Sequence, residues 1–213
     1  MLTVRPYRAA DRETVREIAV ATGFMGESAA WYWRDARSFA DVWTSYYTDL
    51  EPESTFVAEE EDSVVGYLMG CVESKRAPSP QSAITHQLIR RQLLFRPGTA
   101  GFFWRAIWDT LRDPSVPSGE LSDPRWPAHL HMNLLPAARG HGAGRRLMEA
   151  WLRRLRELGS PGCHLGTLAE NTNAIAFFRR MGFERYGPPL LVPGMRLPSG
   201  ARVHEQPMVL TLG

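Results

Sequence analysis

The chain has 213 residues, 44% of them hydrophobic, and a formal net charge of +2. This length is sufficient for one large domain with an adequate core, and the composition argues against intrinsic disorder. The charge is too small to indicate a nucleic-acid-binding protein, in which Lys and Arg gather on one face. The N-terminus carries no apolar leader, and no apolar run is long enough to span a membrane. We therefore expect a cytoplasmic protein that binds neither nucleic acid nor a membrane.

Strand and helix patterns alternate through the first 74 residues. After Asp11, apolar side chains repeat at helical spacing until Gly23, where a helix would end. Farther along, an acidic turn at Glu61 and Asp62 separates two strand-like runs, which predicts a hairpin. In chain order, we expect a strand over 2–7, a helix over 12–22, an aromatic-rich helix over 28–50 and a hairpin over 54–74.

Residues 75–127 have a different character. Turn-rich stretches at both ends bracket two short helical patterns, over 84–95 and 100–111. Trp104 and Trp108 lie beside the apolar stripe of the second pattern, so more than one side of that helix needs cover. We interpret the segment as a helical insertion. Three roles stay open for it: a lid over the functional site, a homodimer contact, or a helical pair packed on its own domain.

From residue 128 onward the strand and helix patterns return. Leu147, Trp151 and Leu155 share one apolar stripe of a helix that ends at Gly159. The expected elements are a strand over 128–135, a glycine-rich loop, the helix just described, a strand over 162–168, a helix over 171–181, a strand over 183–187 and a last strand over 203–212.

The two cysteines, Cys71 and Cys163, each fall inside a strand that we expect to be buried. They are too few for a disulfide framework or a cysteine-based metal site. No base is assigned beside Cys163 by the sequence, so we favour a core residue over a nucleophile there.

Three alternating glycines, Gly140, Gly142 and Gly144, follow a strand directly and open a helix. Unpaired N–H groups and the helix dipole make such a position favourable for an anion, and glycine lets the backbone approach a phosphate closely. A Walker loop is excluded because no Gly-Lys-Ser/Thr follows, and a dinucleotide fingerprint would need a third glycine where Arg145 stands.

The segment Arg139-x-x-Gly142-x-Gly144 resembles the pyrophosphate loop of the GNAT family of N-acetyltransferases. A second family motif, the helix N-x-x-A-x-x-F-Y-x-x-x-G-F, is similar to residues 171–183 of this chain. The stretches ATGFMGESA and HLHMNLLP also resemble bacterial acetyltransferases related to the C-terminal, acetyltransferase-like domain of O-GlcNAcase. The positions that correspond to the second motif are Asn171, Ala174, Phe178, Gly182 and Phe183.

This resemblance implies an α/β (α+β) GNAT fold over residues 1–213 as a single domain: a mixed, twisted sheet of about six or seven strands flanked by helices, with the helical insertion before the central strand. It also implies acetyl-CoA as the co-substrate, with its pyrophosphate on the glycine loop and its pantetheine beside the end of the 128–135 strand. The implied cofactor-binding residues are Leu134, Leu135, Arg139, Gly140, His141, Gly142, Ala143, Gly144, Arg145, Asn171, Ala174 and Phe178.

Family members commonly use a Tyr of the N-x-x-A helix to protonate the leaving thiolate, and here that position is Phe178. His129, His131 and Asn133 alternate along one strand and therefore share one face. We expect His131 to act as the general base, with Asn133 beside it. A purely structural polar ladder is the equal alternative, and no third ligand supports a metal at the two histidines.

Two functions therefore stay open. The first is transfer of an acetyl group to a primary amine of a small molecule or a protein, by direct attack in a ternary complex. The second is a non-catalytic domain that binds acyl-CoA or a protein partner. Three further polar residues are weaker candidates for the site: Glu170, Tyr186 and Asp123.

Overall fold

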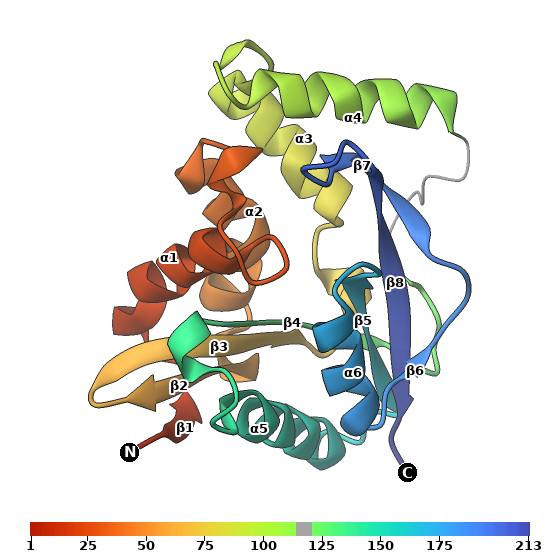
Figure 1. Ribbon diagram of the computed structural model, residues 1–213. Helices are drawn as coiled ribbons and strands as arrows, with labels where there is room; N and C mark the ends of the chain where they lie inside the picture. The colour runs from red at the N-terminus through yellow and green to blue at the C-terminus, as the bar shows by residue number, and fades with distance from the viewer. Residues whose placement is uncertain (114–120) are drawn as a thin grey trace.

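The computed structural model describes residues 1–113 and 121–213, which form one mixed sheet flanked by helices (Figure 1). The sheet order is β1-β2-β3-β4-β5-β8-β6, and β7 pairs with β8 beside this path. The eight strands are β1 (Thr3–Pro6), β2 (Thr55–Glu60), β3 (Ser63–Cys71), β4 (Ala128–Leu134), β5 (Gly162–Leu168), β6 (Glu184–Arg185), β7 (Leu190–Arg196) and β8 (Arg202–Thr211). The helices are α1 (Arg12–Thr22), α2 (Ala36–Asp49), α3 (Pro80–Arg91), α4 (Ala100–Arg112), α5 (Ala143–Glu157) and α6 (Thr172–Arg180).

The mixed α/β fold expected from the sequence is confirmed, with one strand more than expected. The additional strand is β7, which Pro193 and Gly194 interrupt, so it lacks a clear alternating pattern. The expected helix over 28–50 is shorter than predicted. Its chain makes a single 3₁₀ turn first, and α2 begins only where the Asp35 carboxylate accepts the Ser38 N–H at 2.8 Å.

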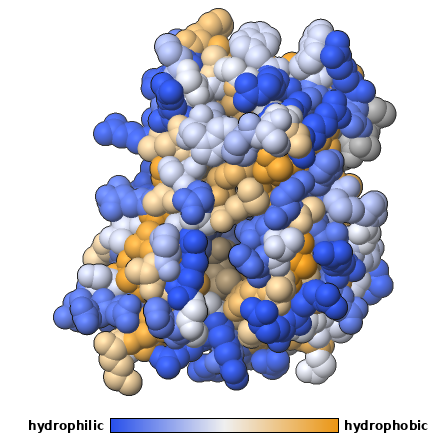
Figure 2. Space-filling view, viewed as in Figure 1, coloured by the Kyte–Doolittle hydropathy of each residue, from blue (hydrophilic) through white to orange (hydrophobic). Residues whose placement is uncertain are grey.

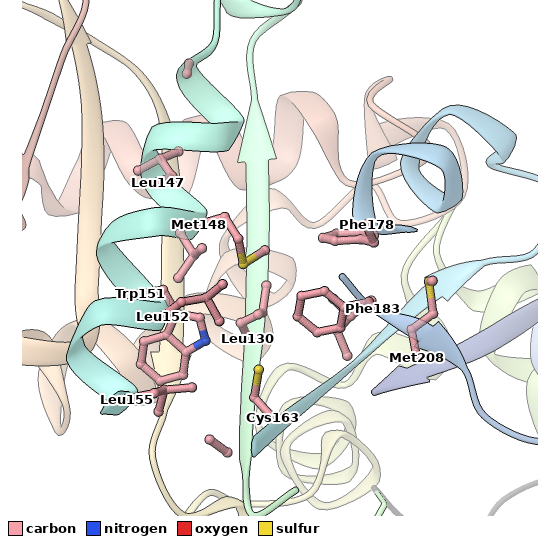
Figure 3. Packing of buried hydrophobic residues seen from close by; sticks show 14 of the residues in the cluster. Leu130, Leu147, Met148, Trp151, Leu152, Leu155, Cys163, Phe178, Phe183 and Met208 are labelled. Atoms are coloured by element: carbon pink, nitrogen blue, oxygen red, sulfur yellow. The ribbon is translucent and has the colours of Figure 1, made fainter. Parts of the chain in front are cut away.

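One face of the sheet packs on α5. Leu147, Met148 and Trp151 project from this helix into a core that includes Leu130 of β4 and Phe178 of α6 (Figure 3). Burying each large apolar side chain stabilises the fold by roughly 1.5–3 kcal/mol. The same contact explains a glycine in β3, because a Cβ at Gly70 would lie 2.4 Å from the Trp151 ring. The amphipathic pattern of the 143–157 helix therefore determines which side of the sheet it covers.

The other face of the sheet packs on α1 and α2 (Figure 1). Val15 and Ile18 of α1 and Tyr47 of α2 contact Tyr67 and Met69 of β3. Strand alternation separates these two side chains of β3 from Leu68, which belongs to the α5 face. Both cysteines are fully buried, one in each of these two cores.

The inserted segment packs on its own domain through α4 and β7. The Asp109 carboxylate accepts the Gly194 N–H at 2.8 Å and forms an ion pair with Arg196 at 2.7 Å. Gly194 has φ +78°, and a Cβ there would lie 2.7 Å from the Phe102 carbonyl oxygen, so the helix and strand touch backbone to backbone. The opposite face of α4 exposes Trp104 and Trp108. The homodimer contact stays a prediction.

Candidate active site

Strands β4 and β5 are parallel neighbours only at their first residues. The paired positions are Ala128 with Cys163 and His129 with His164; beyond them, no further pair is recorded between the two strands in the described ranges. The strands separate and leave a cleft of 1340 Å³ between them, which opens as a hollow near the centre of the face shown in Figure 2. Residues 130–134 of β4 and the glycine loop line this cleft together with side chains of α2 and β8, which are distant from them in sequence.

The N-terminus of α5 forms one end of the cleft. Gly140 and Gly142 have φ +83° and +84°, which only glycine adopts readily, and a Cβ at either would meet open space. The first intrahelical bond is from the Arg146 N–H to the Gly142 carbonyl, at 3.1 Å. The N–H groups of Ala143, Gly144 and Arg145 have no backbone acceptor among the described residues. This end of the cleft therefore offers a cluster of donors and the positive end of the helix dipole to an anion.

The charged side chains of the loop have other partners. The Arg139 guanidinium donates to the Leu134 carbonyl at 3.0 Å and to the Gly26 carbonyl at 2.6 Å. Arg145 forms an ion pair with Glu149 at 2.7 Å, one helical turn away. The His141 ring contacts the Ala137 carbonyl at 3.1 Å and is exposed. The backbone, rather than these side chains, therefore provides the donors that the loop presents.

Of the two strand-end residues expected to contact pantetheine, only Leu134 has its backbone groups in the cleft. The Leu135 N–H donates to the Val65 carbonyl of β3 at 2.9 Å, so it faces away from the gap. Backbone direction alternates along a strand, which turns the Leu134 N–H and C=O toward the gap. The Leu134 carbonyl accepts a hydrogen bond from the Arg139 side chain. Of the backbone groups expected to contact pantetheine, the Leu134 N–H is therefore the one left to do so.

The α6 residues have structural roles here. The Asn171 side-chain oxygen accepts the Ala174 N–H at 3.1 Å and so caps the helix. Phe178 is 7% exposed and packs edge-to-face on Phe177, with ring centres 5.3 Å apart. The side chains of Asn171, Ala174, Phe177 and Phe178 all line the cleft, and none of them has an acidic group that could protonate a leaving thiolate.

His129 is a structural histidine. Ser74 donates its hydroxyl hydrogen to the Pro127 carbonyl at 2.8 Å, so its oxygen must accept from His129 Nδ1–H at 2.7 Å. His129 Nε2 then accepts the Tyr47 hydroxyl at 2.7 Å. Burial lowers the pKa of His129 well below its ordinary value, with the neighbouring histidines contributing. A neutral imidazole thus joins α2, β4 and the segment after β3 at the narrow end of the cleft.

His131 differs because its ring nitrogens have no hydrogen-bond partner among the described residues, and it lines the cleft. Its ring packs edge-on against Tyr47 at 5.4 Å and Trp43 at 5.7 Å. Burial, with the nearby His164, lowers the pKa of His131 to about 4. The imidazole is therefore neutral at pH 7 and able to accept a proton or a hydrogen bond.

Asn133 lies on the same face of β4, but its amide is already bound. It donates to the Thr22 hydroxyl at 2.7 Å and to the Thr22 carbonyl at 3.2 Å, which joins β4 to the end of α1. The face of β4 therefore combines two structural polar residues with one free one, His131.

No sequence pattern singles out Glu205, which the structure places in the cleft. Its carboxylate lies over Gly166 of β5, where an added Cβ would be 2.4 Å from the Glu205 Cδ atom. No described residue hydrogen-bonds or ion-pairs with this carboxylate. Tyr32, Phe39 and Trp43 form an aromatic wall nearby in the same cleft. Glu205 lies in the polar half of β8, between His204 and Gln206, so the sequence pattern does not single it out.

The weaker candidates lie elsewhere. Glu170 pairs with His204 at 3.3 Å, Asp123 pairs with Arg125, and Tyr186 packs edge-to-face on Trp126; none of the three lines the cleft. Across the described part of the chain, no group of three or more His, Cys, Asp or Glu side chains is arranged to hold a metal ion. Within the same residues, no helix is long and apolar enough to cross a membrane.

Comparison with known proteins connects this geometry to a family. Residues 108–185 match the family model described as "Acetyltransferase (GNAT) domain". Mycothiol acetyltransferase of Catenulispora acidiphila is 36% identical over 86 residues, which cover 40% of this chain and 25% of that protein. The Cellulomonas flavigena protein of the same name is 40% identical over 80 residues, covering 35% and 21%. The chain thus spans a quarter or less of these relatives.

Solved structures are similar to this chain over nearly its full length. The structure described as "SsHAT" has a TM-score of 0.66 at 28% identity and covers 99% of this chain and 98% of its own. A putative acetyltransferase from Salmonella typhimurium, solved with its cofactor acetyl-CoA, has a TM-score of 0.58 at 17% identity, covering 100% and 94%. The second shows likeness of fold alone. The narrower resemblance to acetyltransferases related to O-GlcNAcase stays a prediction.

Proposed function

Because residues 108–185 belong to the GNAT acetyltransferase family and the whole chain has its fold, we propose that the protein transfers an acetyl group from acetyl-CoA to a primary amine of a small molecule or a protein. The observation that carries this proposal is the position of the α5 N-terminus. Its unpaired N–H groups open into the gap where β4 and β5 separate, so a phosphate bound there would direct the rest of the molecule between the strands.

Acetyl-CoA would be held mainly by backbone groups. The pyrophosphate would lie on the N–H groups from Gly140 to Arg145, and the pantetheine beside the Leu134 N–H at the open edge of β4. That N–H also faces the place where the thioester carbonyl would lie, and a donor there stabilises the developing oxyanion. Arg139 keeps the Leu134 carbonyl occupied, and Asn171 and Ala174 form the α6 side of the same channel.

The transfer needs two proton movements. The amine nitrogen attacks the thioester carbon, a C–N bond forms, and the C–S bond breaks to release the coenzyme A thiolate. The neutral His131 imidazole, free and facing the cleft, accepts a proton from the nitrogen, and the thiolate takes up a proton as it leaves. Asn133 supports this site by holding β4 against α1 rather than by proton transfer.

Phe178 favours a second candidate function. It stands where the family commonly has Tyr, and it is buried in the core. A domain without that acid could bind acyl-CoA, or a protein partner, without turnover. We favour the enzyme because Tyr32 and Tyr67 also line the cleft, and burial raises the pKa of both hydroxyls, which stay protonated and able to donate.

The proposal is tested in two steps. Calorimetry should show that acetyl-CoA binds and that S-acetylpantetheine, which lacks the pyrophosphate, binds at least about tenfold more weakly. A thiol-release assay over a panel of primary amines should then show acceptor-dependent release. Absence of acetyl-CoA binding would refute the cofactor assignment. Binding without acceptor-dependent release would support the non-catalytic function instead.

A further inference from the structure

We propose that Glu205 binds the ammonium group of the acceptor, and that the acceptor is a cationic primary amine carried on an apolar body. This inference rests on the proposed function and deepens it, because it assigns a substrate class to the same cleft. It depends on three observations: the level of Glu205 in the gap, the absence of a partner for its carboxylate, and the apolar wall beside it.

Strand alternation puts Glu205 and His131 on the same side of the sheet, on the two walls of the cleft. The pairs Ala128 with Cys163 and His129 with His164 put His131 of β4 level with Gly166 of β5. Side chains alternate along both strands, so residue 166 faces the same side of the sheet as His131. The Glu205 carboxylate covers Gly166 on that side. An ammonium group seated in the gap would therefore contact the carboxylate on one side and the neutral imidazole on the other, and it gives up one proton to the Glu205 carboxylate before its nitrogen attacks the thioester.

Gly166 makes this position of the carboxylate available. A Cβ there would lie 2.6 Å from the Glu205 Oε1 atom, closer than nonbonded atoms approach, so any larger residue would displace the carboxylate. Gly166 does not have a positive φ, which means that close approach, rather than backbone conformation, is what requires glycine.

Within residues 1–113 and 121–213, the Glu205 carboxylate has no counter-ion. Among the described residues that line the cleft, the acidic side chains are Glu149 and Glu205, and Glu149 is paired with Arg145 at the cofactor end. Glu205 is exposed along the cleft, and partial desolvation by the surrounding protein raises the pKa of its carboxyl above the ordinary value. A cationic group would remove that penalty by forming a charge-assisted hydrogen bond.

The rest of the acceptor side is apolar and aromatic. Tyr32, Phe39 and Trp43 face the cleft from the segment between α1 and α2 and from α2 itself. Met25 and Val192 contribute further apolar surface. A hydrocarbon or aromatic body would bury apolar area here, and aromatic faces also attract cations. Polar polyamines and zwitterionic amino acids lack this match, and the carboxylate of an amino acid would be repelled by Glu205.

The test compares three probes: 2-phenylethylamine, putrescine and L-phenylalanine. Calorimetry with the coenzyme A-saturated protein measures their binding, and thiol release from acetyl-CoA measures their turnover. We expect 2-phenylethylamine to bind roughly 10- to 100-fold more tightly than either of the other probes, because putrescine lacks the apolar body and the carboxylate of L-phenylalanine is repelled. Glu205→Gln should weaken 2-phenylethylamine binding by roughly 10- to 100-fold, the size of a charge-assisted hydrogen bond, chiefly through KM and without changing acetyl-CoA affinity.

Two variants serve as controls. Gly166→Ala keeps the Glu205 charge but displaces it, and should weaken 2-phenylethylamine binding by about three- to tenfold. Glu184→Gln removes an exposed carboxylate on β6 and should change neither binding nor turnover. Equal binding of the three probes, no binding of any, or an unchanged affinity in Glu205→Gln would each overturn the inference. If the protein without substitutions does not bind acetyl-CoA, the proposed function is refuted instead. Failure of the Glu205 inference and failure of the proposed function are therefore distinguishable.

Discussion

The two ends of the cleft are built in different ways. The cofactor end consists of backbone donors from one continuous segment, residues 134–145, where glycines and a helix start create the binding surface. The acceptor end consists of side chains from α2, β4 and β8, which are distant in sequence and meet only in the fold. The first is therefore evident from residue spacing alone, whereas the second depends on strand register.

The ends also differ in electrostatic character. The α5 dipole and its unpaired N–H groups favour an anion, whereas the unpaired Glu205 carboxylate favours a cation. Between them, His131 is neutral. This polarity allows the anionic acetyl-CoA and a cationic acceptor to approach from opposite sides. Variants at one end should therefore affect acetyl-CoA binding, and variants at the other should affect binding and turnover of the acceptor.

The largest difference between the effect on turnover and the effect on acetyl-CoA binding is expected at His131. His131→Ala should lower kcat by about 10²- to 10³-fold, because the nitrogen loses its proton acceptor. The Kd for acetyl-CoA should change less than about threefold, since no group of the cofactor end is altered. Thiol release with 2-phenylethylamine and calorimetry measure the two quantities. Comparable losses in both would contradict a role in proton transfer, and His86→Ala on the exposed face of α3 provides the control.

Acidification should destabilise the fold through His131, which lies between the two ends of the cleft. The pKa of His131 is lowered from 6.5 to about 4, so between these values the unfolded chain binds more protons than the folded one. The stabilisation is present above pH 6.5 and is lost as pH falls toward 4, by at most about 3 kcal/mol.

Urea unfolding at pH 7.5 and pH 5 measures this loss. His131→Gln should reduce the difference between the two pH values, whereas His86→Gln should leave it unchanged. An equal pH dependence in both variants would show that His131 is not the group responsible.

The cofactor end should respond to a single methyl group. Gly142→Ala places a Cβ where phosphate oxygens would approach and should raise the Kd for acetyl-CoA by about tenfold. Gly159→Ala is a matched control at the other end of α5, because Gly159 also has a positive φ and open space around it. Both should lose about 1 kcal/mol of stability from backbone strain. Similar changes in Kd would contradict a phosphate site at the loop.

The smallest effect is expected for the exposed arginine of the loop. Arg145→Gln should change the Kd for acetyl-CoA by less than about threefold, because the side chain is directed along α5 to Glu149 and surface ion pairs contribute little. A tenfold loss would show that Arg145 turns toward the phosphate in the complex, and that the backbone is not the main source of donors.

The parts that the sequence predicted are those with local physical causes. Turn residues and apolar spacing predicted α1, the β2–β3 hairpin and the α5 helix, and the glycine spacing predicted the open helix N-terminus. The polar face of β4 was also predictable, because alternation alone puts His129, His131 and Asn133 together. What the pattern could not tell is which of the three is free.

The remainder depends on contacts between distant segments. His129 is satisfied by Tyr47 and Ser74, which lie 82 and 55 positions away, and Asn133 by Thr22, 111 positions away. Glu205 became a candidate only because β8 pairs with β5 and Gly166 leaves room for its carboxylate. No local pattern in a single sequence encodes these pairings.

The buried cysteines have a practical consequence. Cys71 and Cys163 are both fully buried, and burial raises the pKa of each thiol to about 12. Because a disulfide reagent reacts with the thiolate, neither side chain should consume it while the chain is folded. Every thiol detected during turnover would then be released coenzyme A, so the native protein contributes no background. The two cysteines react with the reagent only when the chain is unfolded. The amount of reagent consumed before turnover begins therefore measures the fraction of unfolded molecules in the preparation.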